Sequence, residues 1–406
     1  VRSNEQNYLG AVSALQEAIG GAKIARKYDS RHRTIRLKRD VDFRTVSIIE
    51  ERLKDEWPLD IEIEAKRAYP ESTLAAHLLG YMGLTQEKDL QRLHVSEAKS
   101  YLLGDFIGRT GLEQIYESTL RGKDGVRYIE VDARNRIRRD FPDREQAPQP
   151  GGDLWLTIDF EVQKAAERAL PNTLPGSVVA LDPRNGAILA LASKPTFNPN
   201  VFVSFQEQEE RTRLLQSEKN DLLNRATQGT YPPGSTLKLV AAAAALETGI
   251  TDTLSTFAAC AGSLQVGDHV FRCLKRDGHG ELNLLQAVET SCNIYFLHLA
   301  QMLGIEAWWE YGEKFGFGQP TGVNLSPKEM RGQLPSRQYY KERTGWVQGH
   351  LMNLVIGQGD MLATPIQMAR YVAILGNGGR LITPYVYGPP PAPRTIEGIS
   401  PATFEI

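Results

Sequence analysis

The pattern of hydrophobic and polar residues changes near residue 150. Before that point, short apolar runs stand between charged residues. Residues 34–37 and 61–64 are β-like runs, and the alternation of Ile and Glu in the second suits a strand with one solvent-facing side. Residues 45–54 favour a helix. We therefore predict that residues 1–147 form an elongated, mixed α/β module.

A short segment rich in proline and glycine follows at residues 148–153. Such a segment is typical of a linker between domains, which leaves residues 154–406 as a second domain. The beginning of this second domain predicts a strand at residues 154–158. An amphipathic pattern at residues 160–170 then predicts a helix.

Two further strands are predicted at residues 177–181 and 187–192. The Asp-Pro-Arg-Asn-Gly sequence between them, at residues 182–186, favours a tight turn. Helical patterns dominate the later part of the chain, at residues 236–247, 284–303, 307–315 and 365–375. We expect an α+β fold in which a helical lobe packs beside an antiparallel sheet.

Length and charge narrow the class of protein. A chain of 406 residues is too long for one ordinary core, and its formal net charge is only −2. Basic residues cluster at residues 23–44 but alternate with acidic ones, so we do not expect nucleic-acid binding. No apolar run could span a bilayer. Because the chain begins at Val1 without an initiator methionine, we expect an N-terminal membrane anchor to precede it in a longer protein.

Residues 229–238 read Gly-Thr-Tyr-Pro-Pro-Gly-Ser-Thr-Leu-Lys and lead into an apolar run. The prolines and glycine cannot continue a helix, so Ser235 should lie at a helix start. Residues three apart share a helix face, which places Lys238 beside Ser235. A lysine whose pKa is lowered by burial could accept the hydroxyl proton of the serine. The alternative is an ordinary helix-start serine beside a solvated lysine.

A second polar group, Ser291 and Asn293, lies inside a helix-like segment. At a turn or helix end, a hydroxyl and an amide could relay protons and hold a substrate carbonyl. The alternative is a polar patch on a helix surface. In the first module, His77 is the one candidate for chemistry, and a packed or hydrogen-bonded histidine is the stronger interpretation.

Several motifs occur together in one order. Ser-x-x-Lys at residues 235–238 is followed, about fifty residues later, by Ser-x-Asn at residues 291–293. Gly-Gln-Gly at residues 357–359 and Thr-Pro-Ile-Gln at residues 364–367 come next, and residues 108–116 carry a pedestal motif. With these motifs the chain resembles a class B penicillin-binding protein, most closely the elongation transpeptidases of that class.

The resemblance implies a dimerisation-type pedestal domain followed by a penicillin-binding transpeptidase domain. It implies a serine D,D-transpeptidase that cross-links peptidoglycan stem peptides during cell elongation and is acylated by beta-lactams. Ser235 corresponds to the nucleophile, with its own backbone N–H as half of the oxyanion hole. Lys238 corresponds to the general base, Ser291 to the proton relay, and Asn293 to the residue that holds the substrate amide.

The third motif of the family, Lys-Thr-Gly or Lys-Ser-Gly on a strand, is absent. Arg-Thr-Gly occurs at residues 109–111 and 343–345, but neither position matches the place of that motif in the family. In the family the motif follows the region where this chain stops. We therefore expect it beyond Ile406 in a longer protein, and we do not expect the 406 residues to be competent by themselves.

The cysteines are confined to one short part of the chain. With a nearby histidine they form a Cys₃His set that suits structural zinc, made of Cys260, Cys273, His279 and Cys292. The resemblance agrees with this, because some similar proteins carry a metal beside the second motif. A zinc ion here would pin the loop that carries Ser291 and Asn293. The alternative is a Cys260–Cys273 disulfide with Cys292 simply buried.

The resemblance also implies a location and partners. We expect the bulk of the protein to lie outside the cytoplasmic membrane, in the periplasm, and to work with a SEDS-type (RodA-type) glycosyltransferase and other elongation-complex proteins. Two alternatives remain open: a beta-lactam sensor or class D type beta-lactamase, and a noncatalytic cell-wall scaffold. The long pedestal disfavours the former, and the presence of both Ser235 and Lys238 disfavours the latter.

Overall fold

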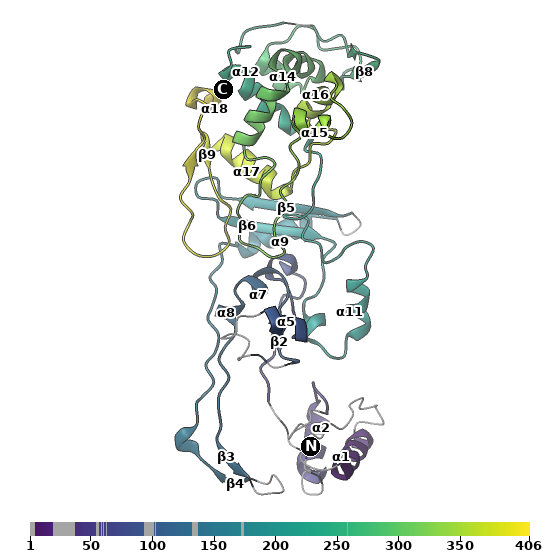
Figure 1. Ribbon diagram of the computed structural model, residues 1–406, viewed down its shortest axis with the longest axis vertical. Helices are drawn as coiled ribbons and strands as arrows, with labels where there is room; N and C mark the ends of the chain where they lie inside the picture. Colours follow the sequence, from purple (N-terminus) through teal and green to yellow (C-terminus); the bar gives the residue numbers. More distant parts are fainter. Residues whose placement is uncertain are drawn as a thin grey trace.

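The computed structural model describes residues 5–18, 37–53, 57, 59, 61, 63–92, 101, 103–131, 137–171, 174–257 and 259–406. The molecule is elongated, with a helical lobe at one end, strands β5 and β6 below it, and the N-terminal helices at the other end (Figure 1). Helices beside an antiparallel sheet confirm the α+β class predicted from the sequence. Within these ranges no helix is both long enough and apolar enough to cross a membrane.

The N-terminal module begins with three helical segments: α1 (Glu5–Ala18), α2 (Phe43–Ile48) and the π-helical turn η1 (Ile49–Leu53). Ala11, Leu15 and Ile49 belong to one small buried core. α2 begins where it does because the Asp42 carboxylate accepts a hydrogen bond from Thr45 N at 2.7 Å. The helix predicted at residues 45–54 is thus confirmed up to residue 53.

The two strands predicted for this module have different outcomes. Residues 34–36 lie outside the described residues, so the first prediction is not tested. In the second run, residues 61, 63 and 64 are not part of a strand, and Ile63 is 97% exposed. Ile61 packs against the N-terminal core but Ile63 does not, so the run lacks the continuous apolar face that fixes a strand in place.

The middle of the molecule holds short elements: α4 (Ala76–Leu79), β1 (Met82–Leu84), α5 (Glu87–Arg92), β2 (Phe106–Gly108), α7 (Gly111–Ile115) and α8 (Glu117–Leu120). β1 pairs antiparallel with β2. Leu78 and Leu112 from this region share a buried core with Ile188 of the second domain. A long ribbon formed by β3 (Ile129–Val131), β4 (Ile137–Asp140) and the short turn η2 (Pro142–Arg144) reaches towards the N-terminal end (Figure 1).

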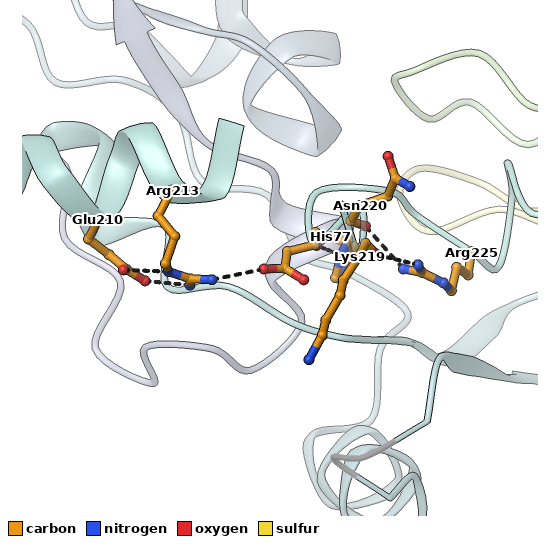
Figure 2. Close-up of polar contacts among 7 residues, drawn as sticks. His77, Glu210, Arg213, Lys219, Asn220 and Arg225 are labelled. Carbon is orange, nitrogen blue, oxygen red and sulfur yellow. Dashed lines mark hydrogen bonds and ion pairs between the residues drawn. The ribbon is translucent and has the colours of Figure 1, made fainter. Parts of the chain in front are cut away.

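His77 of α4 lies where the first module meets the second domain (Figure 2). Its Nε2 atom is 2.8 Å from the carbonyl oxygen of Asp221, and its ring meets Phe197 edge-on at 5.1 Å. Burial lowers the pKa of His77 to about 4, which makes the ring neutral at pH 7. Arg213 and Arg225 hold the segment around Asp221 (Figure 2). His77 is therefore a packed, hydrogen-bonded residue, as predicted.

The second domain is built on the antiparallel pair β5 (Gly176–Leu181) and β6 (Ile188–Lys194), with α9 (Phe160–Ala169) against it. Ala166 of α9 and Ala190 of β6 belong to one buried cluster. The predicted helix and hairpin are confirmed. The strand predicted at residues 154–158 is wrong: Leu156 makes an isolated bridge to Tyr387, so the two segments meet at a point instead of running side by side.

α10 (Asn200–Val203) and α11 (Gln208–Leu215) lie beside the middle of the molecule, where Val201, Phe202 and Leu214 share a buried cluster with Ala76 (Figure 1). The remaining elements form the helical lobe and its attachments: η3 (Gly234–Leu237), α12 (Lys238–Glu247), β7 (Ser263–Val266), β8 (His269–Arg272), α13 (Leu284–Glu289), α14 (Asn293–Lys314), α15 (Arg337–Lys341), α16 (Gln348–Val355), α17 (Pro365–Gly376), β9 (Arg380–Leu381), β10 (Arg394–Thr395) and α18 (Pro401–Glu405). The predicted helix at 365–375 is confirmed. The single helix predicted at 284–303 is wrong, because residues 290–292 separate α13 from α14.

Candidate active site

Ser235 lies on an exposed turn in front of a buried helix. The turn is the 3₁₀ segment η3, and the regular helix α12 begins only at Lys238. The prediction of a helix start is therefore right to within one turn. Lys238 is 3% exposed and the alanines that follow it are buried, as the apolar sequence of this helix predicts. Ser235 is exposed to solvent and Lys238 is enclosed by protein.

Lys238 joins the two predicted motifs. Its Nζ atom donates hydrogen bonds to Ser291 O at 2.8 Å, to Ser291 Oγ at 3.0 Å and to Asn293 Oδ1 at 2.7 Å. These bonds use all three protons of an ammonium group. The structure thus brings Lys238, Ser291 and Asn293 together. Among the described residues, the Ser235 hydroxyl makes no hydrogen bond to any of them.

Burial changes the acidity of this lysine. It lowers the pKa of Lys238 to about 8, against an opposing effect of the nearby sulfur atoms of Cys273 and Cys292. At pH 7 about a tenth of the molecules then carry a neutral amine, which is the form that can accept a proton. When Lys238 loses a proton, its hydrogen bond with the Ser291 hydroxyl can persist, because a hydroxyl can either accept or donate a hydrogen bond.

Ser291 owes its position to an unusual backbone conformation. Its φ angle is +50°, in the left-handed region that glycine usually occupies after a helix. There it ends α13: Ser291 N donates to Val288 O at 3.0 Å, and Cys292 N donates to Ala287 O at 2.9 Å. The turn directs both the carbonyl and the hydroxyl of Ser291 at Lys238. Left-handed serine carries no clear sequence signal, so this break was missed.

Asn293 is held at both ends of its side chain. Oδ1 accepts the bond from Lys238, and Nδ2 donates to the carbonyl oxygen of Arg272 at 3.1 Å. These two contacts fix which side of the amide faces the lysine. Arg272, at the end of β8, was not a sequence candidate. The one signal that could have found it is its position directly before Cys273.

The predicted metal ligands form one cluster, in which the side-chain ligand atoms of Cys260, Cys273, His279 and Cys292 all lie within 4.8 Å of one another. His279 Nδ1 is 3.7 Å from Cys260 Sγ and 3.5 Å from Cys273 Sγ, and Cys273 Sγ is 3.9 Å from Cys292 Sγ. A tetrahedral zinc ion, with bonds of about 2.3 Å to sulfur and about 2.0 Å to nitrogen, would separate its ligands by about 3.5 to 3.8 Å. The cluster therefore fits a Cys₃His site.

The alternative disulfide between Cys260 and Cys273 is not formed, because all three cysteines are free and buried. Cys260 instead pairs through its backbone with Gly280, which closes the loop that contains the β7–β8 hairpin. Cys292 stands between Ser291 and Asn293. A metal bound to the cluster would therefore tie this hairpin loop to the residues that hold Lys238.

Two family models match the chain. The penicillin binding protein transpeptidase domain matches residues 176–395, which is more than half of the chain, and the penicillin-binding protein dimerisation domain matches residues 6–156. The chain belongs to the penicillin-binding protein family. The resemblance predicted from the sequence motifs is thereby confirmed, and so is the order of a pedestal followed by a transpeptidase domain.

Known penicillin-binding proteins resemble this chain over most of its length. The peptidoglycan D,D-transpeptidase MrdA of Acinetobacter baumannii is 38% identical over 347 residues, which are 84% of this chain and 50% of the relative. PBP2 of Helicobacter pylori, solved in complex with MreC, has a TM-score of 0.86 and 27% identity, covering 99% of this chain and 75% of that one. The chain spans about half the length of the curated relatives it matches.

A third similarity concerns an assembly. A solved structure described as structural coordination of polymerization and crosslinking by a peptidoglycan synthase complex contains a chain with a TM-score of 0.74 and 30% identity. The match covers 100% of this penicillin-binding protein and 71% of that chain.

Proposed function

We propose that this penicillin-binding protein is a peptidoglycan D,D-transpeptidase that cross-links stem peptides through an acyl-enzyme on Ser235. The observation that carries the proposal is the set of hydrogen bonds from Lys238 Nζ to Ser291 and Asn293, one helical turn from an exposed serine. A buried lysine of lowered pKa beside a second hydroxyl is what activation of a serine requires. The curated relative MrdA is named for the same activity.

The residues support the following steps. Ser235 Oγ attacks the carbonyl between the two terminal D-alanines of a stem while neutral Lys238 accepts its proton. The N–H of Ser235 stabilises the negative charge that develops on the carbonyl oxygen. Ser291 passes a proton to the amine of the departing D-alanine and regains one from protonated Lys238, the C–N bond breaks, and the acyl-enzyme remains. The amine of a neighbouring stem then attacks the acyl carbon and gives a proton to Lys238. The ester C–O bond breaks as that proton returns to Ser235 Oγ, which forms the cross-link and frees Ser235. Asn293 holds the substrate amide. Beta-lactams acylate the same oxygen.

Structural zinc is the second part of the proposal. Three separations within the Cys₃His cluster, 3.5 to 3.9 Å, are close to those of a tetrahedral site, and a site closed by four protein ligands leaves no open position for substrate. Zinc would therefore supply rigidity to the turn of Ser291 and Asn293. The lysine, serine and asparagine side chains would carry all of the chemistry.

Domains, location and partners complete the proposal. We infer a pedestal at residues 1–147, a linker at residues 148–153 and a transpeptidase domain at residues 154–406. We place the protein on the outer side of the cytoplasmic membrane, held by an N-terminal anchor. Its partners would be a SEDS-type glycosyltransferase and other elongation proteins, in agreement with similar chains solved with MreC and in a peptidoglycan synthase complex.

Labelling of the full-length protein with a fluorescent penicillin tests the activity. Stable labelling that is lost in Ser235→Ala and kept in Ser255→Ala, a change of an exposed serine away from the motif, would support an acyl-enzyme on Ser235. Rapid release of the label would favour a beta-lactamase, and complete lack of label a noncatalytic scaffold. Formation of cross-linked dimers from purified stem peptides would then establish transpeptidation.

A further inference from the structure

The backbone around Ser235 is held from one side by the chain between α16 and α17. Tyr231 and Ala363 exchange two hydrogen bonds, each with an N···O distance of 2.9 Å. Gly234 N donates to Gly357 O at 2.8 Å. The turn that carries Ser235 is therefore attached both four residues and one residue before the serine itself.

A third attachment follows the serine. The hydroxyl of Tyr371, in α17, donates to the carbonyl oxygen of Thr236 at 3.2 Å. Tyr371 is 1% exposed, and its ring packs edge-on against Phe315 at 5.3 Å, so the hydroxyl has little freedom to move. The backbone on both sides of Ser235 is thus hydrogen-bonded to one later part of the chain, residues 357–371.

The contact between Gly357 and Gly234 leaves no room for a side chain. A Cβ atom added to Gly357 would lie 2.1 Å from Gly234 O, 2.6 Å from Gly234 N and 2.7 Å from Gly234 C. Separations under about 3.0 Å are repulsive for carbon, and these three atoms are backbone that cannot swing aside. Gly234 C is bonded to Ser235 N. Any side chain at position 357 would therefore displace the peptide unit that ends at the serine.

We propose that Gly357, assisted by Tyr371, is a positioning residue that sets the location of the Ser235 oxygen and N–H relative to Lys238. This inference rests on the proposed function, because it concerns the rate at which Ser235 is acylated. The Ser235 hydroxyl lacks a hydrogen bond to Lys238, Ser291 or Asn293 in the described part of the chain, so its place depends on the backbone. A misplacement of about 1 Å in a reacting group can slow a reaction by about 100-fold.

The test compares three glycine-to-alanine variants of the full-length protein. Gly357→Ala pushes on Gly234. Gly359→Ala is the matched control for backbone strain, because both glycines have φ angles of +68° while a Cβ at position 359 would meet Asn353 Cβ at 3.2 Å and not the serine turn. Gly349→Ala, in α16, adds a methyl group to open space and controls for substitution itself.

The measurement is the acylation of each variant by a fluorescent penicillin, followed in time. The final labelled fraction reports how much protein is folded, and the saturating rate constant reports the alignment of Ser235. We expect Gly357→Ala to lower this rate constant about 100-fold with a labelled fraction close to that of Gly359→Ala. The pH midpoint of acylation should stay where it is in the wild type, since Lys238 is anchored by Ser291 and Asn293 and not by Gly357.

Two results would overturn the inference. One is a Gly357→Ala rate constant equal to that of the wild type. The other is an equal loss in Gly357→Ala and Gly359→Ala, which would assign the effect to backbone strain alone. Wild-type protein that takes up no penicillin would refute the proposed function instead, so the two failures are distinguishable.

Tyr371→Phe covers the case in which Gly357→Ala does not fold. The change keeps the packed ring and removes only the bond to Thr236 O. Loss of one hydrogen bond to the turn should slow acylation up to about tenfold at an unchanged labelled fraction. A wild-type rate constant in this variant, with Gly357→Ala unfolded, would refute positioning by residues 357–371.

Discussion

Two groups of residues, here called the side-chain wall and the backbone wall, form the surroundings of the Ser235 turn, and they differ in chemistry. The side-chain wall consists of Lys238, Ser291 and Asn293, and it is backed by the Cys₃His cluster. The backbone wall consists of Gly357, Ala363 and the hydroxyl of Tyr371. The side-chain wall contains a lysine whose pKa is lowered to about 8 and the four proposed metal ligands, so we expect its state to depend on pH and, if zinc binds, on metal.

The backbone wall has no group that titrates near neutral pH. Its two main contacts are between peptide groups, and burial raises the pKa of Tyr371 above its ordinary value. This wall should hold the same geometry over the range in which the side-chain wall changes its charge. Under the proposed function, the reactivity of Ser235 and its location would therefore be controlled separately. Each prediction below changes one wall and asks whether the other is affected.

Removal of the lysine should have the largest effect. In Lys238→Met the base is lost while a side chain of similar length fills the space, and acylation by penicillin should slow by about 1,000-fold, within the usual range for general-base catalysis. Stopped-flow labelling of the full-length protein measures it. Lys341→Met, on the exposed surface of α15, is the matched control. A loss below about tenfold with a normal circular dichroism spectrum would remove Lys238 from the role of base.

Loss of the metal should have the next largest effect. We expect metal analysis to find one zinc ion per chain, and His279→Ala to lose it. Because the ion would tie the hairpin loop to Cys292, its loss should lower the melting temperature and slow acylation by about 10- to 100-fold. His269→Ala, an exposed histidine outside the cluster, should behave as wild type. Metal-free protein with an unchanged melting temperature after chelation would contradict a zinc site.

The side-chain wall was the more accessible part of the site from sequence. Its residue types are ones that commonly catalyse reactions or bind metals, and they occur at recognisable spacings: serine, lysine, asparagine, cysteine and histidine. The structure brings these predicted residues together. What the sequence did not supply was the break at Ser291, since a serine in a left-handed conformation looks like any helical serine. The hydrogen bond from Asn293 to the carbonyl oxygen of Arg272 could not be predicted from the sequence either, because every residue carries the same backbone carbonyl group.

The backbone wall was not predictable in this way. The Gly-Gln-Gly motif at residues 357–359 was visible, but only the folded chain shows that Gly357 touches Gly234 while Gly359 does not. The fold shows the same limit. The hairpin of β5 and β6 and the helix α9 were predicted from periodicity and turn residues, whereas the strand predicted at 154–158 needed a partner running alongside, which no local pattern specifies.

The pH dependence of the acylation rate constant should be set by the side-chain wall alone. Burial lowers the pKa of Lys238 to about 8 from its ordinary value of 10.5, so the ammonium form dominates below pH 8 and the reactive amine above it. The rate constant should rise about tenfold between pH 7 and pH 9 and then level off. The unfolded chain binds more protons than the folded one between the two pKa values, so this lysine also makes stability rise with pH there.

Rate constants measured at constant ionic strength from pH 6 to pH 10 check this prediction. Gly357→Ala should show the same midpoint at a lower plateau, because the backbone wall carries no titrating group in that range. A midpoint that moves in Gly357→Ala would show that the two walls are coupled. A rate that falls as pH rises would contradict a lysine base altogether.

The smallest expected effect is a difference in stability that comes from the backbone strain at Ser291. Ser291→Ala and Ser291→Gly both remove the hydroxyl that Lys238 contacts, so both should slow acylation to the same degree. Only glycine adopts the φ angle of +50° at this position without steric cost, and the glycine variant should therefore exceed the alanine variant by about 1 kcal/mol in free energy of unfolding. Denaturant titration of the two variants measures this difference. Equal stabilities would mean that the turn relaxes once the hydroxyl is gone, in which case Lys238 would be holding Ser291 in its left-handed conformation and not the reverse.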